Sequence, residues 1–339
     1  KGQRELAAAV FRAITGGRRL YAQAPTGIGK TLSTLFPAIK TLGEHKAGKL
    51  FYLTAKTVTR IVAEEATALL REKGLRLKSV TLRAKDKICL CDETICNPDY
   101  CPYARGHYDR VNDALYELIT QHDGITPAEV EAWARGHMVC PHELALDAAL
   151  WADLIIGDYN HVFDPTVYLR RFFDGEGGSY VFLIDEAHNL ADRVRDMYSA
   201  SLRKGDFSRL TRSVQDKNRA ASALRRTARS MNRYLLEVSR KLDGQKTASR
   251  PEADTVLNGL VTLFCRAAED WLGQEQQSGH EAFHEVLELY FEARTYQTIA
   301  NLYSERFTTL LEAEDGMTVT QFCLDPSAVI CEKLGMARA

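Results

Sequence analysis

The sequence contains few cysteines, no long apolar run and almost no net charge. Eight cysteines in 339 residues are too few for a disulfide scaffold. The longest apolar stretches are far shorter than the ~20 residues that cross a bilayer. Since no signal peptide opens the chain, we expect a cytoplasmic protein with no membrane partner. A net charge of −1 gives no basic field over the whole molecule, so any surface for nucleic acid must come from local clusters of charge.

The rest of the composition is that of a globular protein. Apolar residues make up 45% of the chain, which is enough to build the cores of two or three domains. The chain begins at Lys1 without a Met, which is typical of an excised fragment.

The segment RRLYAQAPTGIGKTLSTLFPAIK, residues 18–40, predicts a strand, a phosphate-binding loop and a helix. Gly27 and Gly29 let backbone N–H groups turn toward phosphate oxygens, next to Thr26. Lys30 would reach the β- and γ-phosphates, and the hydroxyl of Thr31 would bind Mg²⁺. Ala stands at position 24, where the strict motif has Gly. The alternative is a chance Gly-rich turn, which the strand, loop and helix in sequence disfavour.

A second segment, GSYVFLIDEAHNLADRV, predicts the other half of a nucleotide site. The apolar run 180–184 is typical of a buried parallel strand, and it ends in two carboxylates. Asp185 would hold Mg²⁺ and Glu186 would polarise the attacking water during γ-phosphate hydrolysis. His188 lies where a side chain can sense the nucleotide. Taken alone, the two carboxylates could be a solvated strand end, but their pairing with Lys30 favours a nucleotide site.

APTGIGKT together with DEAH resembles the superfamily-two helicases. The resemblance implies that Gln3 reads adenine, and that Thr54, Thr57 and Arg60 contact the DNA backbone. It also implies an α/β fold, a RecA-like parallel sheet with the nucleotide at the carboxyl ends of its strands. We expect these strands at residues 20–24, 50–55, 77–82, 152–158 and 180–184.

KDKICLCDETICNPDYCPYARGHYDR, residues 85–110, gathers four cysteines in a polar stretch. Their spacings, C-x-C, C-x4-C and C-x4-C, match no common zinc motif. Lys30 and Asp185 are 155 positions apart, more than a minimal RecA-like core needs, so we expect an insertion that begins here and ends near a fifth thiol, Cys140. A structural zinc site remains the alternative, because thiolates bind either metal.

At this point the resemblance sharpens to the XPD/DinG branch of iron–sulfur DNA helicases. It implies a 4Fe-4S cluster, with Cys91 as a bystander and with Lys85, next to Lys87, facing the cluster or a DNA phosphate. The ligands it implies are Cys89, Cys96, Cys101 and Cys140. Thr126, Pro127 and Glu129 predict a helix start in the same insertion, so the cluster would hold together a small helical lobe. Cys265, Cys323 and Cys331 have apolar neighbours in the sequence and are predicted to pack in cores.

Residues 195–318 follow a helical pattern, broken at 241–254. The resemblance implies an arch of helices here, and a hole between the two insertions through which single-stranded DNA passes. Residues 209–233 carry eight Lys or Arg against one Asp, whereas residues 269–292 are rich in Glu. This predicts either a basic helix that faces DNA or a solvated face paired with the acidic helices. Tyr159, Asn160 and His161 are a further DNA candidate by stacking or phosphate binding, with ordinary loop packing as the alternative.

These expectations divide the chain into a RecA-like motor domain (1–82, 146–194 and 319–339), a cluster domain (83–145) and an all-α arch (195–318). The resemblance implies a monomeric 5′-to-3′ DNA helicase that uses ATP and Mg²⁺ on single-stranded DNA, in DNA repair or replication. The sequence contains no second motor domain, so the chain alone should bind nucleotide weakly and hydrolyse it poorly. An ATP-gated DNA-binding module without unwinding activity, or the helicase part of a helicase–nuclease, are the alternatives.

Overall fold

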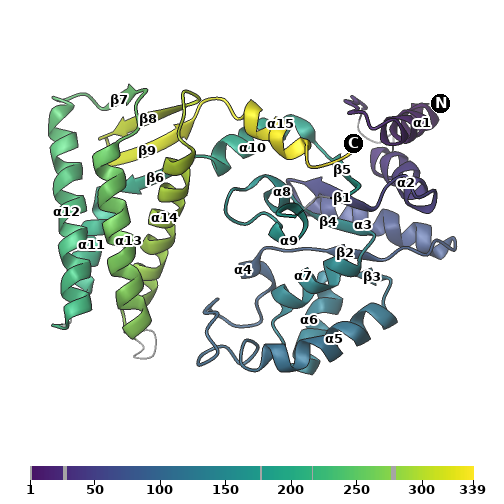
Figure 1. Cartoon of the computed structure of the whole chain (residues 1–339), viewed down its shortest axis with the longest axis horizontal. Coiled ribbons are helices and arrows are strands. Elements are labelled where there is room, and N and C mark those ends of the chain that lie inside the picture. Colours follow the sequence, from purple (N-terminus) through teal and green to yellow (C-terminus); the bar gives the residue numbers. More distant parts are fainter. Residues whose placement is uncertain (1, 26–28, 176–177, 216, 276–279) are drawn as a thin grey trace. The chain divides into compact units, whose positions relative to one another are not determined.

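The computed structural model describes residues 2–25, 29–175, 178–215, 217–275 and 280–339 (Figure 1). The chain divides into two compact units. The first unit comprises residues 1–163, 167–190 and 329–339, and the second comprises residues 164–166 and 191–328. No helix among the described residues is both long enough and apolar enough to cross a bilayer.

A five-stranded parallel sheet forms the centre of the first unit, in the order β3-β2-β4-β1-β5. Its strands are β1 (Lys49–Thr54), β2 (Ser79–Thr81), β3 (Gly124–Ile125), β4 (Leu154–Asp158) and β5 (Tyr180–Ile184). Apolar side chains on both faces make the central strands suitable for burial between helices. Leu53 pairs with Gly157 on one side and with Ile184 on the other, so the carboxyl ends of three strands meet at one edge. The predicted α/β fold and four of the five expected strands are confirmed.

The fifth expected strand, residues 20–24, does not form. Leu20 and Tyr21 are 43% and 83% exposed, and no strand pairing includes them. The outer edge of β5 instead bonds to the C-terminal residues, where the N–H of Phe182 donates to Ala339 O at 3.0 Å and the N–H of Arg338 donates to Tyr180 O at 2.8 Å. A strand needs a neighbouring ladder of hydrogen bonds, and in this unit that edge is taken by residues 338–339.

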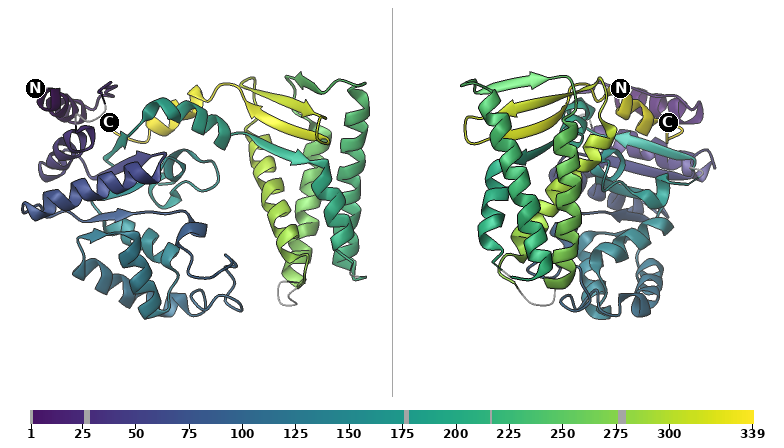
Figure 2. Two further views of the ribbon diagram at one scale, coloured as in Figure 1. Left: turned by 180° about the vertical axis from the view of Figure 1, so that it is seen from behind. Right: turned by 60° about the vertical axis from the view of Figure 1, so that its left-hand side comes forward.

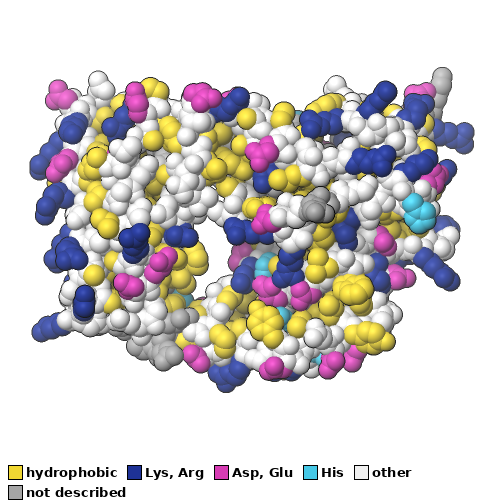
Figure 3. Space-filling model, in the orientation of Figure 1, with side chains coloured by type: hydrophobic (Ala, Val, Ile, Leu, Met, Phe, Trp, Pro, Cys, Tyr) yellow, Lys and Arg dark blue, Asp and Glu magenta, His cyan; other side chains and the backbone are white. Residues whose placement is uncertain are grey.

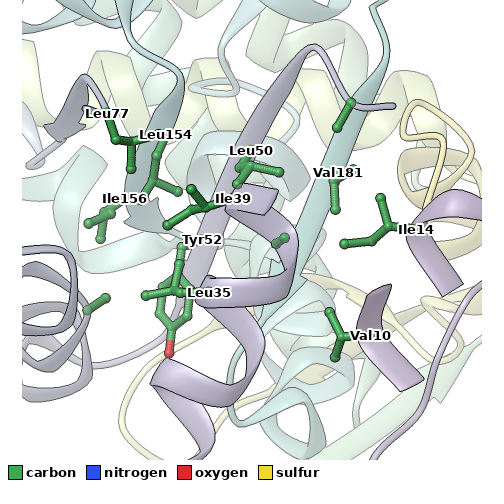
Figure 4. Close-up of a cluster of buried hydrophobic side chains, with 13 residues drawn as sticks. Val10, Ile14, Leu35, Ile39, Leu50, Tyr52, Leu77, Leu154, Ile156 and Val181 are labelled. Carbon is green, nitrogen blue, oxygen red and sulfur yellow. The ribbon is translucent and has the colours of Figure 1, made fainter. Parts of the chain in front are cut away.

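Three helices pack against this sheet and carry its apolar core. They are α1 (Gly2–Thr15), α2 (Lys30–Gly43) and α3 (Thr57–Glu72). Figure 4 shows Val10 and Ile14 of α1 near Val181, and Leu35 of α2 beside Tyr52 of β1. Burying a side chain of this size contributes roughly 1.5–3 kcal/mol, so the core fixes the start of α2 relative to the ends of the strands.

The insertion between β2 and β4 is a small helical lobe. It contains α4 (Lys85–Ile88), α5 (His107–Gln121), α6 (Pro127–His137) and α7 (Pro141–Trp151), and the last three pack against one another. The predicted capping box is present, because the N–H of Thr126 donates to Glu129 Oε2 at 2.9 Å. Short helices α8 (Asn160–Phe163) and α9 (Arg170–Phe173), a 3-10 helix (Ala187–Asn189) and α15 (Ser327–Leu334) complete the elements around the sheet.

The second unit combines long helices with an antiparallel sheet (Figure 2). Its helices are α10 (Leu190–Met197), α11 (Lys204–Ser213), α12 (Arg219–Lys241), α13 (Thr255–Glu275) and α14 (Phe283–Leu302). Its strands are β6 (Ala200–Arg203), β7 (Thr247–Arg250), β8 (Phe307–Glu312) and β9 (Thr318–Cys323), in the order β6-β9-β8-β7. Along the chain α11, α12, α13 and α14 pack each against the next.

Two sequence expectations are corrected in this unit. Residues 195–318 are not all helical, because β6, β7 and β8 lie among them. The chain rejoins the first unit at Val329 rather than at residue 319, because β9 pairs with β6 and β8. The expected loop at 241–254 contains β7, which is held by Asp254. This buried carboxylate accepts hydrogen bonds from Tyr234 and Arg250, and it caps α13 through the N–H of Leu257.

Candidate nucleotide and metal sites

The start of α2 lies at the carboxyl edge of the sheet. Gly29 precedes the helix in the left-handed region, with φ of 73°, a conformation that glycine adopts without strain. Its carbonyl accepts the N–H of Ser33 at 3.1 Å, so the first turn is formed. The free N–H groups of such a turn attract anions. Two predicted phosphate-loop residues, Thr26 and Gly27, lie outside the described residues.

Lys30 and Glu186 meet at this edge, although 156 positions separate them. Lys30 Nζ lies 3.3 Å from Glu186 Oε1, and the two side chains are 32% and 30% exposed. Asp185 and Glu186 directly follow β5, and the N–H of Asp185 donates to Leu53 O at 2.9 Å. Glu186 has φ of 52°, an uncommon value for a residue with a side chain. The residues predicted to grip phosphate and to activate water are thus brought together.

The two predicted Mg²⁺ ligands meet at a third side chain. The hydroxyl of Tyr52 lies near both Thr31 and Asp185, and burial together with the charge of Asp185 raises the pKa of Tyr52. A hydroxyl and a carboxylate at one point form a donor set that hard cations prefer, so Thr31 and Asp185 fit the proposed ion. Tyr52 was not predicted. The signal for it was a tyrosine inside an otherwise apolar strand, whose polar tip needs a partner.

Two further predicted nucleotide residues lie beside this cluster. His188 Nδ1 is 3.5 Å from Glu186 Oε2, and the His188 side chain is 71% exposed. Gln3 of α1 lies over Gly29, because a Cβ at Gly29 would come within 2.6 Å of the Gln3 amide nitrogen. A larger residue at position 29 would move the end of the flexible Gln3 side chain, so the positive φ is the stronger reason for glycine here.

The loop after β4 is packed inward, which corrects the prediction of a DNA-stacking tyrosine. Tyr159 is fully buried, and its hydroxyl donates to the carbonyls of Asp185 and Glu186. His161 accepts the N–H of Asp158 at Nδ1, and burial lowers the pKa of His161 to about 4. Asn160 is half-buried, and its Oδ1 has no hydrogen-bond partner among the described residues. Tyr159 therefore holds the Asp185–Glu186 turn instead of stacking on a base.

The start of α3 also differs from the expected DNA contacts. Thr54 is buried, and its hydroxyl bonds to the hydroxyl of Thr59 in the first turn of α3, so it does not face solvent. Arg60 donates to Leu82 O at 3.3 Å and to Thr57 Oγ1 at 3.0 Å, and burial lowers its pKa. Only Thr57 of the three is exposed. The expectation that Thr54 contacts DNA is corrected, because its side chain is used inside the fold.

The cysteines of the lobe lie around Lys85 and the ends of short helices. Cys89 follows α4 and Cys140 immediately precedes α7. Burial opposes the charge of Lys85, but hydrogen bonding to Cys96 and the nearby Glu143 and Cys140 outweigh it, so the pKa of Lys85 is raised. Burial raises the pKa of the Cys140 thiol, and the first N–H groups of α7 act against that shift. Lys85 thus lies near both Cys96 and Cys140.

A second pair of thiols lies in the same lobe. Cys91 Sγ is 3.8 Å from Cys101 Sγ, with Cys89 also next to Cys91. Two thiolates on one tetrahedral ion with metal–sulfur bonds of ~2.3 Å would be about this far apart. No three His, Cys, Asp or Glu side chains within the described residues converge to hold an ion. Five thiols are chemically suited to a sulfur-ligated metal centre and are enough in number to supply its ligands. In the described structure they do not surround a single position where one ion could bind.

Two residues of α5 hold the backbone at Cys140 in place, and no sequence pattern indicated their role. The N–H of Cys140 donates to Nδ1 of buried His107 at 3.2 Å. One turn later, Arg110 donates to the carbonyls of His137 and Met138 at 3.1 and 2.6 Å. Met138 is in the left-handed region, with φ of 54°, where its carbonyl is turned out of α6. His107 and Arg110 therefore fix the segment that carries the last thiol.

Replacing His107 by Ala should accelerate loss of bound metal to a chelator by roughly 10- to 100-fold, as is typical when an outer-shell partner of a metal ligand is removed. The reason is that Cys140 loses the acceptor that fixes its backbone. His107→Asn places an amide oxygen near the Nδ1 position and should restore most of the retention. Metal release from the purified protein, followed with a coloured chelator, measures this. Equal release rates for the wild type and the Ala variant would contradict it.

Comparisons with known proteins match parts of the chain to helicase families. The DEAD/DEAH box helicase family model matches residues 4–103, and the DEAD_2 model matches residues 54–207. A probable ATP-dependent helicase of Methanocaldococcus jannaschii is 24% identical over 196 residues, which cover 57% of this chain and 29% of that protein. The chain therefore spans less than a third of this curated relative.

Two solved structures share the fold. An XPD helicase aligns with a TM-score of 0.61 at 18% identity, over 98% of this chain and 55% of that chain. A truncated XPD aligns with a TM-score of 0.62 at 18% identity, over 98% of this chain and 90% of that chain. At this identity the likeness is one of fold.

Proposed function

We propose that this chain, which is XPD-like and of the superfamily-two helicase type by its family matches and fold, is the ATP-binding part of a DNA helicase. The observation that carries the proposal is the meeting of Lys30 with Glu186, beside Thr31 and Asp185, at the carboxyl edge of a parallel sheet. Ligands of such sheets bind at this edge. The family matches name helicases, and the described edge holds the charged groups that ATP hydrolysis needs.

Each group at the edge has a distinct role in hydrolysis. Lys30 would bind the β- and γ-phosphates. Thr31 and Asp185 would hold Mg²⁺, whose positive charge would help to neutralise the same phosphates. Glu186 would orient and polarise the attacking water. The 3.3 Å contact between Lys30 and Glu186 would open as a phosphate enters, because the phosphate competes for the ammonium. His188, 3.5 Å from the same carboxylate, would sense that change, and Gln3 would read adenine.

On the DNA side, we propose single-stranded DNA as the track and 5′ to 3′ as the direction of movement. Thr57, which is exposed at the start of α3, and Lys85 of the lobe would contact phosphates. Contacts of this kind carry affinity without reading sequence. Arg60 and Asn160 would take part only after leaving their present packing. The protein would act as a monomer, in DNA repair or replication, in the cytoplasm.

We further propose that residues 83–145 form a cluster domain and that residues 191–328, in the second unit, form an arch. Cys89, Cys96, Cys101 and Cys140 would hold a 4Fe-4S cluster. When bound, the cluster would cross-link segments of a lobe that is small for a stable core of its own. Lys85 and the α7 N-terminus would offset its negative charge, and Cys91 would remain a bystander.

ATP turnover by the natural full-length polypeptide tests the proposal. We expect Mg²⁺-dependent hydrolysis that single-stranded DNA stimulates, and weak nucleotide binding with poor hydrolysis by residues 1–339 alone. Replacing Lys30 by Ala should abolish turnover. Hydrolysis with no response to DNA would contradict the proposal. DNA-stimulated hydrolysis without strand separation would instead support an ATP-gated DNA-binding module.

A further inference from the structure

Helix α12 carries a row of arginines along one side. Arg219, Arg226, Arg233 and Arg240 follow one another at intervals of seven residues, and Arg229 lies beside them. A seven-residue interval drifts only about 20° around a straight helix, so these five residues, the arginine row, share one face. At 1.5 Å per residue the row is about 32 Å long.

The row is exposed to solvent. All five arginines are classed as exposed, whereas the opposite side of α12 is buried, including Leu224, Met231 and Leu235. Dark blue side chains gather along the left edge of Figure 3, over α12. The helix holds seven Lys or Arg and one Glu, in a chain whose net charge is −1. The positive charge is thus concentrated on this surface.

The acidic helices do not neutralise the row. Among the described residues, no ion pair involves any of its five arginines. Glu269 of α13 accepts a hydrogen bond from Tyr290 at 2.7 Å and lies 3.9 Å from Arg294 of α14. Glu292 of α14 faces Asp206 and Arg203 instead. The sequence left two alternatives for the basic segment, and one of them was pairing with the acidic helices. The described residues do not show that pairing for the arginine row.

The chemistry of the row favours a phosphate backbone over bases. Its exposed face has no aromatic residue, since Ser222, Leu236 and Glu237 are the other exposed side chains between Arg219 and Arg240. Proteins that bind single strands without sequence preference use aromatic stacking as well as charge. A rigid line of guanidinium groups suits the higher and more regular charge density of a duplex, one charge per about 1.7 Å of axis.

We infer that the arginine row binds the phosphate backbone of a nucleic-acid duplex, separately from the single strand engaged by the ATP-driven unit. The inference rests on the proposed function for the presence of nucleic acid. It adds a second surface, on the second unit, that retains the duplex portion of a substrate. Each contact would release counterions from the duplex and add to the salt dependence of binding.

Replacing Arg226, Arg229 and Arg233 together by Ala tests this inference in the natural full-length polypeptide. We expect duplex affinity to fall by roughly tenfold or more, and the slope of log affinity against log salt to become shallower by about 2–3. Affinity for a single strand of equal length should change far less. Lysines at the same three positions should retain most of the binding. A matched control, Lys246, Arg266 and Arg294 to Ala, removes three exposed cations of the same unit.

The outcomes separate this inference from the proposed function. Unchanged duplex affinity and salt slope in a variant that still binds single strands would overturn the proposed role of the arginine row in duplex binding. The helicase proposal would remain intact. Equal losses for duplex and single strand, or an equal loss in the control variant, would also overturn it. A wild-type protein that binds neither form would overturn the proposed function itself. Circular dichroism of all variants verifies that α12 remains folded.

Discussion

Replacing Glu186 by Gln should lower the rate of ATP hydrolysis by roughly 10²- to 10⁴-fold, the usual contribution of a positioned general base. Nucleotide binding should survive, because Lys30, Thr31 and Asp185 are retained. The substitution keeps the size of the side chain and removes the charge that lies 3.3 Å from Lys30 and 3.5 Å from His188. The expected result is a protein that binds ATP and does not turn it over.

Steady-state hydrolysis and equilibrium binding of a fluorescent ATP analogue, measured on the full-length polypeptide, separate these two effects. Asp192→Asn is the matched control, because it removes one carboxylate from an exposed position on α10, where the Asp192 side chain is 79% exposed. It should leave turnover unchanged. Turnover by Glu186→Gln at the wild-type rate would show that Glu186 is not the base.

Replacing Cys89, Cys96, Cys101 or Cys140 by Ser should remove the bound iron and the broad visible absorbance of the protein, whereas Cys91→Ser should keep both. A 4Fe-4S cluster binds one thiolate on each of its irons, so one of the five neighbouring thiols is not needed as a ligand. Cys96 and Cys140 both lie near Lys85. Cys101 is buried in the lobe, where a lost ligand cannot be replaced by water without cost.

Iron content per chain and the visible spectrum of protein purified without oxygen measure this directly. The Cys91→Ser variant is a demanding control, because Cys91 lies 3.8 Å from Cys101 and is as close to the site as a ligand. Loss of iron in that variant would place Cys91 in the ligand set. A colourless wild-type protein with about one zinc per chain would replace the cluster with a structural zinc site.

The sequence predicted the parts of the fold that local patterns determine. Continuous apolar runs predicted β1, β2, β4 and β5, and Thr126, Pro127 and Glu129 predicted the start of α6. The pairing of Lys30 with Glu186 followed from motif chemistry, since a phosphate-binding lysine and an acidic strand end belong to one site. These features depend on residues near one another in the sequence or on well-defined chemistry.

Other features depend on contacts that no local pattern contains. The strands β6 and β7 have only four residues each, and Ala200 pairs with Gln321, far along the chain, so the antiparallel sheet was missed. Tyr159 stands in a polar segment that is typical of a surface loop, but its side chain is buried under the Asp185–Glu186 turn. Cys265 and Cys323 are buried as predicted, whereas Cys331 is exposed on α15.

The position of the phosphate loop shows a further limit. Residues 20–24 have the apolar character of a strand, but a strand also requires a free edge, and the edge of β5 bonds to residues 338–339. Sequence pattern predicts the propensity of a segment, and the available partner decides whether it is realised. The same reasoning explains Thr54, whose hydroxyl bonds to Thr59 of α3 inside the fold rather than facing a ligand.

Strand displacement by the full-length polypeptide shows whether this chain is part of an ATP-driven helicase. The substrates are two partial duplexes with single-stranded tails, one at the 5′ end and one at the 3′ end, labelled so that separation is seen as fluorescence. We expect the 5′-tailed duplex to be separated in a reaction that requires ATP and Mg²⁺ and that is lost in Lys30→Ala. Separation without ATP, separation that survives Lys30→Ala, or no separation of either duplex by an enzyme that hydrolyses ATP would contradict it.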